Sequence, residues 1–156
     1  MKHFPKLLAS IIGCELVGFL SVPFTSTAIP SWYASLTKPP FAPPNWLFAP
    51  VWTFLYLSMG VSLYFVWIQG WRKKKIKVAM RWFFLQLALN FLWSPLFFGL
   101  RSPVLALTEI VWLWLLIAMT MKHFYELSKP AFYLLIPYLL WVTFAAILNA
   151  SIVALN

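Results

Sequence analysis

The sequence predicts an all-α membrane protein, built as a bundle of five transmembrane helices. The 156 residues are 63% hydrophobic and 10% charged, with a mean hydropathy of +0.84. Soluble domains are closer to half apolar and about a quarter charged. Five apolar runs each approach the ~20 residues that a spanning helix needs. No run alternates polar and apolar residues with the period of two that is typical of a strand.

The five apolar runs belong to a single predicted domain, residues 1–156, because no internal repeat divides the chain. Inside a bilayer every backbone polar group must find its partner within the protein, so each run is expected to be a helix. The predicted spans are residues 7–24, 46–69, 82–100, 104–121 and 131–155.

The first run also has features of a secretory signal. Lys2 and Lys6 precede an apolar stretch that ends in the small residues 26–28. However, Glu15 lies inside this run, and the run is long for the apolar core of a signal. Both features favour a retained transmembrane helix.

Proline residues mark the connections and breaks. The stretch KPPFAPPNW, residues 38–46, cannot be a helix interior, because proline lacks an amide donor and has a fixed φ. Ser102 and Pro103 fit a helix N-cap followed by the first helical residue. Pro95 and Pro137 fall inside spans and predict kinks there.

The charges predict an orientation in the membrane. Ten of the 12 Lys and Arg residues lie in the N-terminal segment and the second and fourth connections, and two lie in the first and third. This asymmetry predicts an N-terminus inside and a C-terminus outside. The net charge of +9 clusters between apolar runs, which indicates a membrane surface and argues against nucleic acid. Anionic lipid is expected at Arg72–Arg81, with a partner protein as the alternative.

Residues that could bind a metal or exchange protons are few. Cys14 is the single cysteine, and His3 and His123 lie in terminal or loop positions, so neither a metal site nor a haem ligand is expected. Glu15 and Glu109 lie inside predicted spans, where an ionisable group is a functional candidate. No carboxylate at a matching position completes a proton relay, so neither receives a role.

Polar and aromatic residues recur on single faces of the predicted helices. One interpretation is a cavity for a large, planar, mostly apolar ligand. The other is hydrogen bonding and packing between helices, which spacing alone favours. These faces contain Trp52 and Tyr56 in the second span, Gln86, Asn90, Trp93 and Phe97 in the third, and Pro137, Trp141, Ala145 and Asn149 in the fifth.

Four stretches are distinctive, and they follow one another along nearly the whole chain. They are WYASLTKPPFAPPNW at residues 32–46, PVWTFLYLSMG at 50–60, LALNFLWSPLFFG at 87–99 and PYLLWVTFAAILN at 137–149. In content and order they resemble the TspO/MBR family, the tryptophan-rich sensory proteins related to the mitochondrial translocator protein. The resemblance implies five transmembrane helices around a ligand pocket, with residues 27–45 as a stiff, non-helical lid. A connector without ligand contact is the alternative.

The resemblance also implies a function. Members are similar in binding porphyrins such as protoporphyrin IX, with no cofactor required, so we expect porphyrin binding for sensing, transport or disposal. One alternative is a photo-oxidative porphyrin-degrading enzyme, in which two pocket tryptophans, here Trp52 and Trp141, are catalytic. Another is a regulatory partner or a lipid- or sterol-binding transport protein. Matching motif positions place the ligand contacts at Tyr33, Trp52, Asn90, Trp93, Trp141 and Ala145.

The chain also departs from the family pattern. Leu105 replaces a pocket tryptophan of animal members, so the drug binding of the family does not carry over to this chain from the resemblance. Residues 149–156 lack the Tyr and Arg of the animal cholesterol motif, so no sterol site of that type is expected. Arg81 and Leu85 replace small residues that some members use for a dimer contact, so a homodimer would need another surface. The short chain, without a mitochondrial-type presequence, favours a prokaryotic membrane.

Overall fold

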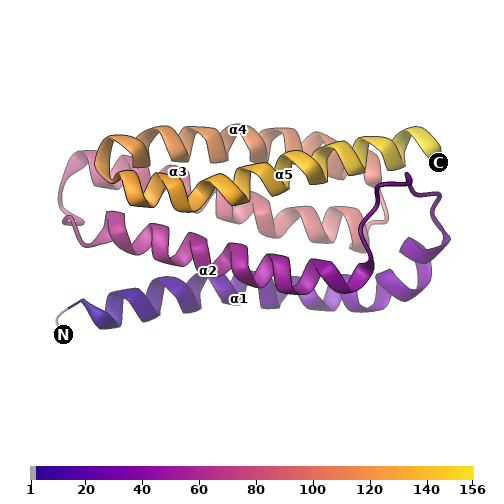
Figure 1. The fold of residues 1–156 in the computed structure, drawn as a ribbon, viewed down its shortest axis with the longest axis horizontal. Coiled ribbons are helices and arrows are strands. Elements are labelled where there is room, and N and C mark those ends of the chain that lie inside the picture. The colour runs from indigo at the N-terminus through magenta and orange to yellow at the C-terminus, as the bar shows by residue number, and fades with distance from the viewer. Residues whose placement is uncertain (1–2) are drawn as a thin grey trace.

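The computed structural model describes residues 3–156, and within that range all the regular structure is helical. Five long helices run side by side along the longest axis of the molecule (Figure 1). Each is long and apolar enough to cross a membrane, which confirms the predicted five-helix membrane bundle. The helices are α1 (Phe4–Ala28), α2 (Phe48–Trp67), α3 (Lys74–Ser94), α4 (Pro103–Leu127) and α5 (Lys129–Leu155).

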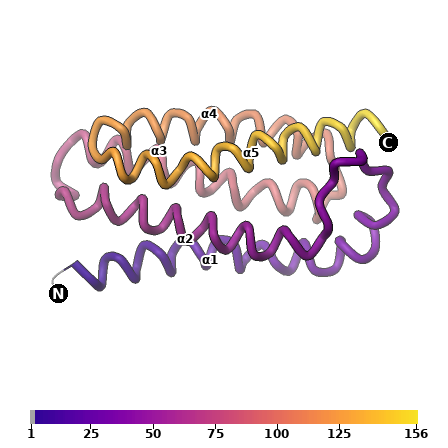
Figure 2. Tube along the Cα trace, in the orientation of Figure 1, coloured from indigo at the N-terminus to yellow at the C-terminus, as the bar shows by residue number. Residues whose placement is uncertain are grey.

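The helices form a closed ring, and their order around the ring differs from their order in the sequence. Around the ring, α1 packs against α2, α2 against α5, α5 against α4, α4 against α3, and α3 against α1. The trace reverses direction at each connection (Figure 2). The N-terminus therefore lies beside the second and fourth connections, and we name this the N-terminal end. The first connection and the C-terminus lie at the other end, the lid end (Figure 1).

This arrangement gathers the basic residues at one end. The cations of the second and fourth connections lie with Lys6 at the N-terminal end, while Lys38 and Arg101 belong to the lid end. Lys2 falls outside the described residues. The charge asymmetry therefore follows the long axis of the bundle, and the orientation across a membrane stays a prediction from it.

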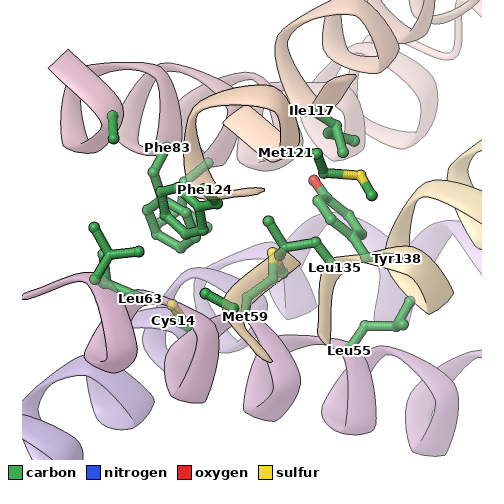
Figure 3. Close-up of a cluster of buried hydrophobic side chains, with 14 of the residues drawn as sticks. Cys14, Leu55, Met59, Leu63, Phe83, Ile117, Met121, Phe124, Leu135 and Tyr138 are labelled. Atoms are coloured by element: carbon green, nitrogen blue, oxygen red, sulfur yellow. The ribbon is translucent and has the colours of Figure 1, made fainter. Parts of the chain in front are cut away.

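Close-packed apolar side chains fill the N-terminal half of the ring (Figure 3). Phe83 of α3 and Phe124 of α4 stack with ring centroids 5.7 Å apart and an interplanar angle of 6°. Met59 and Leu63 of α2 and Leu135 of α5 pack into the same buried cluster. The interior of the ring is closely packed in this half, so a cavity inside the ring is expected nearer the lid end.

The start of α3 differs from the prediction. The basic segment Arg72–Arg81 was predicted as a connection with the helix beginning at residue 82, but α3 begins at Lys74. Ile76, Ala79 and Met80 are almost completely buried. Their packing stabilises the helix, although the cations on its other side lower the hydropathy of the segment. The basic residues therefore form a helical face and not a flexible loop.

The first connection is also more helical than predicted. Residues 27–45 were expected to be non-helical, but α1 extends to Ala28 and continues as the π-helical turn η1, Ile29–Tyr33. Pro30 lies at the second position of that turn, and its missing amide removes one hydrogen bond from a continuing helix, a usual cause of a local change of helix type. Only residues 36–44 lack helical structure before the 3₁₀ turn Asn45–Leu47. We keep the name lid for residues 27–45.

The predicted N-cap at Ser102 is confirmed, whereas the kinks expected at Pro95 and Pro137 stay predictions. α3 ends at Ser94, and Pro95 begins a π-helical turn, Pro95–Gly99. The Ser102 hydroxyl accepts a hydrogen bond from the Leu105 amide at 3.3 Å, and Pro103 is the first residue of α4. Pro137 lies inside α5, which continues through it.

We expect Gly60→Ala to destabilise the bundle, because α1 and α2 approach closely at this residue. A Cβ at Gly60 would lie 2.5 Å from the Ile11 Cα. Because Ile11 Cα belongs to the backbone of α1, the clash could be relieved only by moving one of the two helices. Overpacking of this kind costs about 1–3 kcal/mol. Thermal unfolding of the detergent-purified protein should show a lower midpoint.

Gly13→Ala is the matched control, because no atom lies within 4 Å of a Cβ at that position. Replacing a helical glycine by alanine there should be neutral or stabilise by up to about 1 kcal/mol. Equal midpoints for the two variants would contradict the proposed close contact.

Candidate functional site

A cavity of about 650 Å³ lies in the lid half of the bundle. Small-molecule sites typically measure ~300–1,000 Å³. Side chains from all five helices line the cavity, and Tyr33 and Asn45 reach it from the two ends of the lid. Every predicted ligand contact is among its lining residues, namely Tyr33, Trp52, Asn90, Trp93, Trp141 and Ala145. The fold thus brings together residues that are up to 112 positions apart in the sequence.

Each of the three cavity tryptophans is held by an aromatic neighbour on the same membrane span. The partners stand three or four residues along the chain, where side chains share a helical face. All three indoles are half-buried, so part of each surface is available to a ligand. The pairs are Trp52 with Tyr56, Trp93 with Phe97, and Trp141 with Phe144, with ring centroids 5.5, 4.8 and 5.3 Å apart.

Trp93 has the most restricted position of the three. Its ring lies nearly parallel to Phe97, at an interplanar angle of 16°, and Phe98 packs edge-on against it. Its indole nitrogen is buried and has no acceptor among the described residues. One face of Trp93 is therefore covered by Phe97, and a planar ligand could stack only on what remains.

Hydrogen bonds join three helices beside the cavity, and two of the bonded residues, Tyr56 and Asn90, line it. The Tyr56 hydroxyl donates to Asn90 Oδ1 at 2.5 Å, and Asn90 Nδ2 donates to the Tyr138 hydroxyl at 2.9 Å. The Tyr138 hydroxyl donates in turn to Gln86 Oε1 at 2.8 Å. All four side chains are buried. The chain of bonds joins α2, α3 and α5, and we name it the tyrosine–amide chain.

The sequence left two interpretations of the polar face of α3, a ligand cavity and hydrogen bonding between helices. The tyrosine–amide chain shows that both apply. Gln86 bonds helices together and does not line the cavity, Trp93 and Phe97 line the cavity, and Asn90 does both. One amide N–H and one lone pair of Asn90 are already used, so it keeps at most one of each for a ligand. Tyr138 was missed, although it stands three residues before Trp141 on the same face of α5.

The lid is fastened to the C-terminal end of α5. The Thr37 amide donates to Asn156 Oδ1 at 3.0 Å, and Asn156 Nδ2 donates to the Thr37 carbonyl at 3.0 Å. Phe41 packs edge-on against Phe144, with ring centroids 6.3 Å apart. We name the Thr37–Asn156 pair the lid clasp. It is formed by residues 119 positions apart, so the lid position depends on the complete bundle.

The lid reaches the cavity through its ends. Tyr33 is 3% exposed, and its ring packs edge-on against Phe97 and Phe98. The Lys38 amine lies 4.8 Å from the centre of the Tyr33 ring. The proline-rich residues 36–44 do not line the cavity. Their prolines restrict the backbone, so this part of the lid limits how the distance between Tyr33 and the start of α2 can vary.

The two intramembrane glutamates have different surroundings. Glu15 lines the cavity and is half-buried. Glu109 is 7% exposed, does not line the cavity, and neither of its oxygens has a hydrogen-bond partner within residues 3–156. It therefore does not cap the start of α4. The same part of the chain contains no group of three His, Cys, Asp or Glu residues that could hold a metal ion.

The fold and its aromatic cavity define a class of integral, multi-pass membrane proteins, and comparison with known proteins gives the family. The chain matches the TspO/MBR family over residues 10–155, and it belongs to that family.

Its relatives come from archaea, bacteria and animals. The chain is 46% identical over 152 residues to the tryptophan-rich protein TspO of Archaeoglobus fulgidus, which covers 97% of both chains. It is 47% identical over 150 residues to the TspO of Chlorobaculum tepidum, covering 96% of this chain and 95% of the relative. The translocator protein of Homo sapiens is 38% identical over 143 residues, or 91% of this chain and 82% of the relative.

We expect Tyr138→Phe to lower the free energy of unfolding by about 1–3 kcal/mol, because it leaves buried groups of Asn90 and Gln86 without a partner. Tyr133→Phe is the control, since Tyr133 lies on the same helix and is 58% exposed. It should change stability by less than about 0.5 kcal/mol. Thermal unfolding of both variants tests this, and equal effects would mean that the tyrosine–amide chain contributes nothing.

Proposed function

We propose that the cavity binds a porphyrin such as protoporphyrin IX, for sensing, transport or disposal. The observation that carries this proposal is the convergence of Trp52, Trp93 and Trp141 on one largely apolar cavity of about 650 Å³. Aromatic rings prefer offset-stacked or edge-on contacts with other flat π-systems. A macrocycle that is planar and mostly apolar offers such contacts on both faces, whereas a flexible lipid chain does not.

The expected strength of binding follows from the number of aromatic contacts. Each contributes about 0.5–1.5 kcal/mol beyond the burial of apolar area. Micromolar binding corresponds to about 8 kcal/mol, so three such contacts supply part of the affinity and burial of the macrocycle supplies the remainder. The packing of each indole against an aromatic neighbour on the same span limits the ordering cost on binding.

The names of relatives agree with a role in sensing or transport. A relative from Cereibacter sphaeroides, 38% identical over 126 residues, is named tryptophan-rich sensory protein. A relative from Bos taurus, 42% identical over 136 residues, is named translocator protein. Neither name specifies a ligand, so the porphyrin rests on the cavity and on the resemblance of its motifs.

A second candidate is light-dependent breakdown of the bound porphyrin. It is favoured by Trp52 and Trp141 lining the same cavity from neighbouring helices α2 and α5. In this reaction the porphyrin absorbs the light and molecular oxygen is the oxidant. The tryptophans would hold the macrocycle and steer the reactive species, so they would be catalytic residues in this case only.

The test of binding is the variant Trp52→Phe/Trp141→Phe, titrated with protoporphyrin IX in the dark. The smaller phenyl rings remove part of two stacking contacts, together about 1.4 kcal/mol, and this should raise Kd about tenfold. The absorbance of the porphyrin is the readout, because it does not depend on the tryptophans that were removed. The control is Trp71→Phe/Trp112→Phe, whose side chains are 48% and 61% exposed and lie outside the cavity.

An unchanged Kd in the cavity variant would contradict the proposal that the porphyrin contacts Trp52 and Trp141. Illumination of the saturated samples then separates the two functions. Bleaching that is faster with wild type than with the cavity variant or with denatured protein would support the enzyme. Saturable binding without protein-dependent bleaching would support sensing or transport.

The lid clasp should control ligand exchange more than affinity. Asn156→Ala removes both hydrogen bonds to Thr37, so kon and koff should rise together, severalfold, while Kd changes less. Stopped-flow mixing with protoporphyrin IX measures both rates. Ser151→Ala is the control, because the Ser151 hydroxyl bonds only to the Ile147 carbonyl of its own helix. Unchanged rates in Asn156→Ala would show that the lid does not gate the cavity.

A further inference from the structure

Helix α3 carries a row of cations on its outward face. Lys74, Lys77 and Arg81 are spaced by three and four residues, which places them on one side of a helix. All three are exposed. The buried residues Ile76 and Ala79 lie on the other side, against the bundle. We name these three cations the α3 cationic row.

The same helical face becomes apolar immediately beyond the row. Phe84, Leu85 and Leu92 follow at helical spacing and are 47%, 50% and 43% exposed. From Arg81 to Leu92 the helix rises about 16 Å, at 1.5 Å per residue. That is about half of the ~30 Å hydrocarbon core, or one leaflet. The cationic part of this face therefore lies at the depth of a phospholipid phosphate. The apolar part lies along the acyl chains of the same lipid.

We propose that the outward face of α3 binds an anionic phospholipid, whose phosphate contacts Lys74, Lys77 and Arg81 and whose acyl chains lie along Phe84, Leu85 and Leu92. This site is on the outer surface of the bundle and is independent of the porphyrin cavity.

The charge balance of this end of the bundle supports an anionic partner. Nine Lys and Arg residues lie at the N-terminal end within the described chain. The chain has three carboxylate side chains in total, and two of them, Glu15 and Glu109, lie within spans. Glu126 alone belongs to this end. The protein thus cannot neutralise these cations with its own side chains, whereas the lipid phosphates at this depth can.

The same charges argue against a second copy of the chain on this face. Copies in a membrane share one orientation, so a two-fold axis would run along the membrane normal and bring equivalent residues together at equal depth. Lys74, Lys77 and Arg81 would then face the same three cations of the partner. Such a contact is repulsive, and a phospholipid between copies would be needed to relieve it.

The test uses native mass spectrometry of the detergent-purified protein, titrated with dioleoyl phosphatidylglycerol or dioleoyl phosphatidylcholine. Wild type should bind the anionic lipid at least tenfold more tightly than the zwitterionic one. Lys74→Gln/Lys77→Gln/Arg81→Gln should reduce the affinity for phosphatidylglycerol at least tenfold. The replaced side chains are exposed, and an unchanged thermal midpoint will verify that the variant is folded.

The matched control is Arg72→Gln/Lys122→Gln/Lys129→Gln, which removes the same number of charges at the same end. It should change the phosphatidylglycerol affinity by less than twofold. An equal loss in both variants would mean general surface attraction and would overturn the site, as would an unchanged affinity in the α3 variant.

Two further measurements separate a lipid from other occupants. Phe84→Ser/Leu85→Ser should weaken phosphatidylglycerol binding, and millimolar glycerol phosphate should not displace the lipid. Displacement by glycerol phosphate would indicate a headgroup site without acyl contacts and would overturn the proposal. A wild-type dimer that persists without added lipid and is lost in Phe84→Ser/Leu85→Ser would assign the face to a second copy and overturn the proposal.

Discussion

The hydrogen bonds from Tyr56 through Asn90 and Tyr138 to Gln86 are the constraint on which the rest of the structure depends. In a bilayer these groups have no water to bond, so they must meet one another, and doing so sets the spacing of α2, α3 and α5. On the N-terminal side apolar side chains close the space between the helices. On the lid side the side chains leave a cavity between the helices.

Side-chain packing and the lid clasp maintain the shape of the cavity at the lid end. Each cavity tryptophan packs against an aromatic residue of the same span, which restricts the position of its indole. The prolines of the lid reduce the conformational freedom of a long connection, and the lid clasp attaches it to α5. A site made in this way is largely formed before a ligand arrives, which reduces the cost of binding.

The two ends of the molecule therefore differ in chemistry as well as in packing. The lid end combines aromatic surface with Lys38 and Arg101 as its cations, whereas the N-terminal end carries a dense set of Lys and Arg residues. In a membrane this polarity would keep one end at an anionic surface. The cavity would then face the opposite leaflet.

The sequence by itself determined the number of helices, their apolar character and the residues that share a helical face, because these depend on local composition and on a period of 3.6 residues. The six predicted cavity residues were found in this way and through the resemblance of their motifs. Only the tertiary structure decided that Asn90 bonds to Tyr56 and Tyr138, since those partners lie on other helices. It also decided where α3 begins, because burial of one face outweighs the charge on the other.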